Sequence, residues 1–375
     1  MERLSWNVTA GQSVALTAGS RGIRHILPVT CGVVDHFRKL GLKPFLVPAM
    51  GSHGGATADG QKKLLADYGL TESAAGCPIH SSMETVLLGN LAVEQAGNIP
   101  IHFDKTAYQA DHLFLLNRIK SHTRFSGPIE SGLLKMLMIG LGKAEGAGVY
   151  HRAVAGDRFS RVIIHVADYL MSRISLLGGL GIVENGEGNT AVIEAFHAQE
   201  IPAGEERLLK RSKELMPGIP FEEIDLLFIR RIGKNISGTG FDSNVVGRKF
   251  DDHKATRGEK PVVRCIAVCS LTPETDGNAN GIGMAEFCLS SVLEQVDWPK
   301  TRLNAITANH VSAAMLPLDY PTEEEIMEAA WQTLGRPDWP EFRVLWIDDT
   351  LHLEEMTASE SLRREVERNK NCTIP

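Results

Sequence analysis

Three loops in the first half of this chain each follow a predicted strand and each carry a basic side chain. Arg21 follows the first strand, His53 follows the second, and His122 follows a later one. Ligands of an open parallel sheet bind beyond the carboxyl ends of its strands, where such loops lie together. An arginine suits a carboxylate, and two histidines suit a reaction that needs an acid and a base near neutral pH. We therefore predict a catalytic site here, the alternative being loop histidines without a role.

A single lysine, Lys135, interrupts an apolar and glycine-rich run. Its ammonium must reach water, pair with a carboxylate such as Glu130 or Glu145, or lose its charge. A desolvated lysine has a lowered pKa and can act as a nucleophile. His151 is one more candidate ligand, but none of these histidines has the compact spacing of a known zinc motif, so spacing alone predicts no metal.

Strand and helix patterns alternate along the chain and provide the elements that position these loops. Predicted strands cover 14–17, 44–48, 112–116, 224–229 and 262–269, and predicted helices cover 26–40, 57–68 and 322–334. Such alternation with short connections indicates βαβ units. We predict an α/β fold of two domains, each with a mostly parallel or mixed sheet and flanking helices. The active site is expected in the cleft between the domains.

The length of 375 residues suits two domains. The stretch 205–220 is charged, helical in pattern and ended by prolines, and we interpret it as a connector. We place an N-terminal catalytic domain, with the lysine and the histidines, at residues 1–220. A C-terminal α/β domain that completes the cleft follows at residues 221–375.

Composition excludes several classes of function. Lysine and arginine number 39 against 46 aspartate and glutamate, and this net charge of −7 disfavours nucleic acid as a partner. No apolar run approaches the roughly 20 residues that span a bilayer, and the N-terminus lacks the apolar segment of a secretory signal. Six scattered cysteines favour a reducing compartment. We expect a cytoplasmic protein that acts on a small molecule.

The order and spacing of the candidate residues resemble those of the nickel-dependent lactate racemase family. The matching residues are Gly51-Ser52-His53, Lys120-Ser121-His122, Lys135 followed by Gly140-Leu141-Gly142, and His151. The resemblance extends from about residue 13 to residue 283. The sequence differs from the family at Ser121, where a proline is usual, and at 131–134, just before the lysine.

The resemblance implies a cofactor, a nickel-pincer nucleotide derived from a pyridinium mononucleotide. In the family a thioamide joins this cofactor to a lysine, and the matching residue is Lys135. A histidine completes the nickel coordination, and the match is His151. Two histidines take and return the hydroxyl proton of the substrate, and they match His53 and His122. Arg21 matches the arginine that holds the substrate carboxylate.

In the second domain, Arg248 beside the 241–244 stretch is the nearest match to the family's substrate-binding residues. The implied activity is racemisation or epimerisation of a 2-hydroxy acid by reversible hydride transfer, with the cofactor supplied by its biosynthetic enzymes. Two alternatives remain open. One is a metal-dependent hydrolase or lyase that uses His53, His122 and His151, and the other is a non-catalytic protein that binds a nucleotide or an organic acid. The substrate and the oligomeric state stay open.

Overall fold

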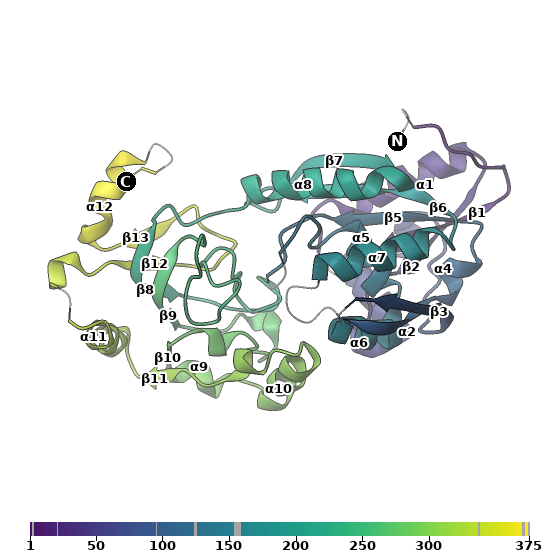
Figure 1. The fold of residues 1–375 in the computed structure, drawn as a ribbon. Helices are drawn as coiled ribbons and strands as arrows, with labels where there is room; N and C mark the ends of the chain where they lie inside the picture. The colour runs from purple at the N-terminus through teal and green to yellow at the C-terminus, as the bar shows by residue number, and fades with distance from the viewer. Residues whose placement is uncertain are drawn as a thin grey trace. The chain divides into compact units, whose positions relative to one another are not determined.

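The computed structural model describes residues 1–375 except 2–3, 21, 95, 124–125, 154–158, 337, 370–371 and 374–375, and except the side chains of 151, 159 and 160. The contacts divide the chain into two compact units, Met1–Met216 and Pro217–Pro375. Each unit contains a sheet flanked by helices (Figure 1). Throughout the described parts of the chain, no helix is both long and apolar enough to cross a membrane.

Unit 1 begins with alternating strands and helices. Its strands are β1 (Ser13–Ala18), β2 (Lys43–Pro48), β3 (Thr85–Val93), β4 (Gly97–Asp104), β5 (His112–Arg118), β6 (Leu176–Glu184) and β7 (Thr190–His197). Its helices are α1 (Ile26–Lys39), α2 (Ala58–Asp67), α3 (Glu72–Ala75), α4 (Lys105–Gln109), α5 (Leu133–Lys135), α6 (Lys143–Ala153), α7 (Phe159–Met171) and α8 (Ile201–Leu215). Single helical turns are η1 (Gly54–Ala56), the π-turn η2 (Met136–Gly140) and η3 (Ala198–Glu200).

The five-stranded sheet of unit 1 has the order β2-β1-β5-β6-β7. Its first four strands are parallel, and β7 is antiparallel to β6. Leu16 of β1 pairs with Leu46 of β2 and with Phe114 of β5, and all three side chains are buried. Strands covered on both faces read as continuous apolar runs, which is why the sequence reveals them. The predicted α/β class is confirmed.

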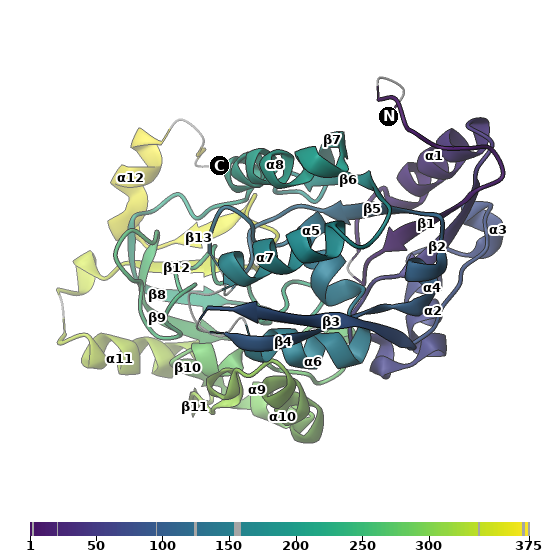
Figure 2. The same ribbon diagram turned by 45° about the vertical axis from the view of Figure 1, so that its right-hand side comes forward.

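Helix α8 occupies most of the stretch that we interpreted as a connector, and that interpretation is wrong. Ile201, Leu208 and Leu209 are buried in the core of unit 1, where α8 packs against β6 and β7. Figures 1 and 2 both show the helix lying along these two strands. Charged residues separate these apolar positions in the sequence, so the buried face of the helix becomes evident only at helical spacing.

Helix α2 begins as its sequence predicts. Thr57 has extended backbone and its side chain accepts a hydrogen bond from the Gly60 N–H at 3.0 Å. This contact satisfies one of the N–H groups that a helix leaves without a partner at its start.

We expect Thr57→Ala to lower the free energy of unfolding by ~1 kcal/mol, because the Gly60 N–H loses its acceptor. Urea denaturation of the full chain measures the effect. Thr57→Ser keeps a hydroxyl at the same place and should lie within a few tenths of a kcal/mol, about the spread among good N-cap residues. Equal losses in both variants would contradict the cap.

Unit 2 holds a second sheet, with the order β11-β10-β9-β8-β12-β13 among its described strands. These strands are β8 (Glu223–Ile229), β9 (Val262–Val268), β10 (Phe287–Leu289), β11 (Leu318–Tyr320), β12 (Val344–Ile347) and β13 (Met356–Ala358). The helices are α9 (Ser290–Glu294), α10 (Trp298–Thr307), α11 (Glu323–Thr333) and α12 (Arg363–Arg368). Short turns are η4 (Pro273–Thr275), η5 (Ile282–Met284), η6 (Val311–Ala314), η7 (Trp339–Glu341) and η8 (Glu360–Leu362). Neighbouring strands are parallel except β13, which is antiparallel to β12.

Candidate active site

The loop after β2 places His53 at the carboxyl edge of the first sheet. Ser20, in the loop after the neighbouring strand β1, forms a hydrogen bond between its hydroxyl and His53 Nδ1. Gly51 and Gly54 have φ values of +57° and +67°, in the left-handed region that glycine adopts without strain. A Cβ on Gly54 would also lie 2.6 Å from the carbonyl carbon of Gly60. The glycines therefore allow the tight loop that presents His53.

The backbone of His122, in the loop after β5, is held by a buried carboxylate. Glu130 Oε2 accepts hydrogen bonds from the His122 N–H at 2.7 Å and from the Ser121 hydroxyl at 3.0 Å. Its other oxygen accepts from Lys213 Nζ, on α8, at 2.6 Å. A proline at position 121 would lack this hydroxyl. Ser121, which differs from the family pattern, therefore has a hydrogen-bond partner in Glu130.

Lys135 is the last residue of the short helix α5 and is half-buried. Its neighbours Leu134 and Met136 are buried. Asn117, at the end of β5, donates a hydrogen bond from Nδ2 to the Gly132 carbonyl at 2.9 Å and so fixes the approach to α5. Of the two carboxylates considered as partners of Lys135, Glu130 has the contacts described above. Glu145 contacts Thr85 and His102.

Close backbone contacts join the His53 loop to the segment after Lys135. The Gly51 N–H donates to the Gly140 carbonyl at 3.0 Å. In the loop after β1, a Cβ on Gly19 would lie 3.2 Å from Met136 Cε. The structure therefore brings the loops after β1 and β2 together with the π-turn that follows Lys135.

Gln61, which the sequence does not identify as a site residue, holds the His53 loop through hydrogen bonds to its backbone. It is fully buried in α2, and its Nε2 donates to the carbonyls of Gly51 at 2.9 Å and of His53 at 3.2 Å. One side chain thus fixes the loop on both sides of Ser52. Gln61 directly precedes Lys62 and Lys63 in a helix of mostly polar residues, so the sequence gives no sign of this burial.

A buried ion pair contacts the side chain of Gln61. Lys143 Nζ lies 2.9 Å from Asp104 Oδ2, and both side chains are fully buried. The same ammonium donates to the Pro48 carbonyl at 2.6 Å and to Gln61 Oε1 at 3.3 Å. Because charges are rarely buried without partners, this network has a structural role. It connects the start of α6 to the end of β2.

A second buried carboxyl contacts the helix of Lys135. Glu205, on α8, accepts a hydrogen bond at Oε2 from the Leu134 N–H at 2.9 Å. Burial raises the pKa of Glu205 from 4.5 to about 7, although backbone N–H groups act in the opposite direction. The spacing of Ile201, Glu205 and Leu208 gives a signal that Glu205 lies on the buried face.

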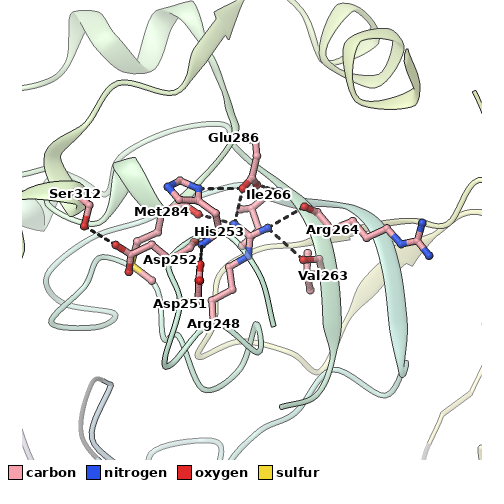
Figure 3. A network of polar contacts seen from close by, with 10 residues as sticks. All are labelled: Arg248, Asp251, Asp252, His253, Val263, Arg264, Ile266, Met284, Glu286 and Ser312. Atoms are coloured by element: carbon pink, nitrogen blue, oxygen red, sulfur yellow. Dashed lines mark hydrogen bonds and ion pairs between the residues drawn. The ribbon is translucent and has the colours of Figure 1, made fainter. Parts of the chain in front are cut away.

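Arg248, which we predicted to bind substrate, lies in the interior of unit 2 with no exposed side-chain surface (Figure 3). Its guanidinium donates a hydrogen bond to the Glu286 carboxylate. It also donates to four backbone carbonyls, which belong to Asp252, Val263, Arg264 and Met284. These bonds tie β9 to the segment that precedes β10. A contact between the Arg248 guanidinium and a substrate would require some of these hydrogen bonds to be broken.

Two predicted residues have no described side-chain geometry. Arg21 lies outside the described residues, and His151 lies on α6 with its side chain outside them. Among the side chains that are described, no three of histidine, cysteine, aspartate and glutamate gather closely enough to hold a metal ion. The three-histidine metal site includes His151, so it stays a prediction, as do the roles of Arg21 and His151.

Comparison with known proteins adds evidence at the level of the fold. No family model and no curated protein matches the chain. A crystal structure of a protein from Thermotoga maritima matches with a TM-score of 0.55 and 13% identity, over 82% of this chain and 79% of that one. The lactate racemase apoprotein from Thermoanaerobacterium thermosaccharolyticum matches with a TM-score of 0.53 and 14% identity, over 91% of this chain and 85% of that one. The chain has a lactate-racemase-like fold.

At 13–14% identity the similarity concerns the fold. The lactate-racemase-like fold confirms, at that level, the resemblance found in the sequence. Activity and cofactor have to be argued from the residues themselves, because one fold supports many chemistries.

Proposed function

We propose that this protein racemises or epimerises a 2-hydroxy acid with a nickel-pincer nucleotide attached to Lys135. The observation that carries the proposal is the 3.0 Å hydrogen bond between the Gly51 N–H and the Gly140 carbonyl. It joins the loop of His53 to the turn that starts directly after Lys135. The lactate-racemase-like fold, over 91% of the chain, supports the same activity.

The residue types fit this cofactor. Lys135 offers a primary amine, the group that a thioamide bond requires, and it lies between the buried apolar side chains of Leu134 and Met136. His151 offers an imidazole, a ligand that suits nickel, on the next helix along the chain. When bound, the cofactor supplies an electron-poor ring that accepts and returns hydride.

The two histidines are proposed to move the hydroxyl proton of the substrate. Removing this proton while the α-hydrogen leaves as hydride avoids a carbanion. The Ser20 hydroxyl orients the ring of His53, and Glu130 fixes the backbone at His122. Histidines on two separate loops allow either enantiomer to lose its proton. Arg21 is proposed to hold the carboxylate, since a guanidinium binds carboxylates with two parallel hydrogen bonds.

Intact mass tests the attachment. The full chain is co-expressed with the cofactor-making enzymes and nickel, beside Lys135→Ala and a matched control, Lys105→Ala, whose lysine forms an exposed ion pair with Glu84. We expect a covalent adduct on the unaltered chain and on the Lys105→Ala variant, and none on the Lys135→Ala variant. Chiral chromatography of 2-hydroxy acids incubated with the modified protein then identifies the substrate.

An unmodified chain, beside a lactate racemase that is modified in the same cells, would overturn the proposed attachment. Tight zinc binding by the unmodified protein would then favour the metal-dependent hydrolase or lyase. Stabilisation by a nucleotide or an organic acid, without any loss of substrate chirality, would favour the binding protein.

A further inference from the structure

The carboxyl group of Glu205 lies directly against the turn that carries Lys135. Its Oε2 accepts from the Leu134 N–H at 2.9 Å, and the Leu133 N–H also contacts this carboxyl. The residue before the helix, Gly132, provides no side-chain cap. Glu205 therefore supplies the acceptor that the first N–H groups of α5 need.

The fit between this carboxyl and the backbone is close. A Cβ on Gly132 would lie 2.3 Å from Glu205 Oε1 and 2.5 Å from its carboxyl carbon. Only glycine at position 132 leaves room for the carboxyl at this distance. Oε1 itself is buried and has no hydrogen-bond partner in the described part of the chain. An unpartnered buried oxygen is costly, so the backbone hydrogen bonds to this carboxyl are what offsets its burial.

The same helix also holds the other predicted catalytic loop. Lys213 lies eight residues after Glu205, which is ~12 Å along the axis of α8. Its ammonium contacts Glu130, the carboxylate that fixes the backbone of His122. Helix α8 thus sets the Lys135 turn and the His122 loop on one rigid support.

We propose that Glu205 is a positioning residue that fixes the turn presenting Lys135 for attachment of the cofactor. The proposal rests on the proposed function, because it assumes that Lys135 is the point of attachment. Glu205 acts through the backbone of Leu133 and Leu134 and takes no part in bond making itself. Its acceptor oxygen, rather than its charge, carries the role.

Four variants of the full chain separate this role from general stability. Glu205→Leu removes the acceptor, and Glu205→Gln keeps an acceptor of the same shape without the charge. Gly132→Ala displaces the carboxyl from the other side, at a φ of −175° that alanine tolerates. Glu206→Leu is the matched control, since Glu206 pairs with Lys210 on the solvent side of α8.

Two readouts are measured on each variant: amide hydrogen exchange at 133–135 without cofactor, and the modified fraction by intact mass after co-expression. In the Glu205→Leu and Gly132→Ala variants we expect faster exchange and a modified fraction lower by about tenfold. The Glu205→Gln and Glu206→Leu variants should stay within about twofold of the unaltered chain in both readouts, because the acceptor is kept.

Unaltered exchange and modification in the Glu205→Leu variant would overturn the proposal, as would loss of modification in the Glu205→Gln variant. If Glu205→Leu prevents folding, the Glu205→Gln and Gly132→Ala variants decide the question by the same two readouts. Failure of the proposed function has a different signature. In that case the unaltered chain carries no adduct, whereas exchange at 133–135 still shows whether Glu205 holds the turn.

Discussion

Replacing Lys143 by methionine is expected to lower the free energy of unfolding by ~3–5 kcal/mol, the usual loss when one partner of a buried ion pair is removed. Methionine fills a similar volume but leaves the Asp104 carboxylate buried without its cation. It also removes the donor to the Pro48 carbonyl and to Gln61. Urea denaturation of the full chain measures the loss.

The matched control is Lys105→Met. Lys105 lies next to Asp104 in sequence, and its ion pair with Glu84 is exposed, so we expect a loss of ~0–1 kcal/mol. Combining Lys143→Met with Asp104→Asn should recover part of the stability, because the amide is uncharged and its oxygen can still cap α4 through the Ala107 N–H. Additive losses in the double variant would contradict the ion-pair explanation.

The stability of the protein is expected to fall by up to ~3 kcal/mol between pH 4.5 and pH 8 because of Glu205, relative to a variant in which that residue is Gln. Burial raises the pKa of Glu205 to about 7 in the folded chain, against 4.5 for an exposed carboxyl. Between these values the folded state keeps a proton that the unfolded state has released. The contribution of Glu205 is therefore complete below pH 4.5 and is lost as the pH rises through about 7.

Urea denaturation of both proteins across this pH range measures the difference. The free energy of unfolding of the Glu205→Gln variant should rise, relative to that of the unaltered chain, as the pH increases. Glu206→Gln, on the solvent side of the same helix, should show no such trend. Parallel pH profiles for the unaltered chain and the Glu205→Gln variant would show that Glu205 titrates with the same pKa in both states.

The sequence predicts the strands that are buried on both faces because their apolar runs are continuous. It predicts the His53 and His122 loops because each histidine follows one of these apolar runs, where the ligands of a parallel sheet bind. The antiparallel strands β3 and β4 escape notice, since half-exposed residues weaken their pattern. The supports of the site are harder to predict, because they depend on partners far along the chain.

Glu205 and Lys143 show which buried contacts the sequence indicates and which it does not. Glu205 lies at helical spacing from Ile201, Leu208 and Leu209, so a periodicity analysis of α8 could have placed it on the apolar face. Lys143 follows Gly142 at the start of a helix and has the pattern of an ordinary surface lysine. Only the packed structure reveals that Asp104 and Pro48 surround it.

The anchoring of two site loops by α8 also has a consequence for the order of folding. The hydrogen bond between Glu205 and Leu134 spans 71 residues, and the one between Lys213 and Glu130 spans 83. Contacts of such long sequence separation close late, because the entropy of a large loop must be lost first. On the ribosome, α8 is also the last helix of unit 1 to emerge. The turn of Lys135 therefore gains its final shape only when the N-terminal unit is otherwise complete, so the proposed attachment of a cofactor would require an already folded unit.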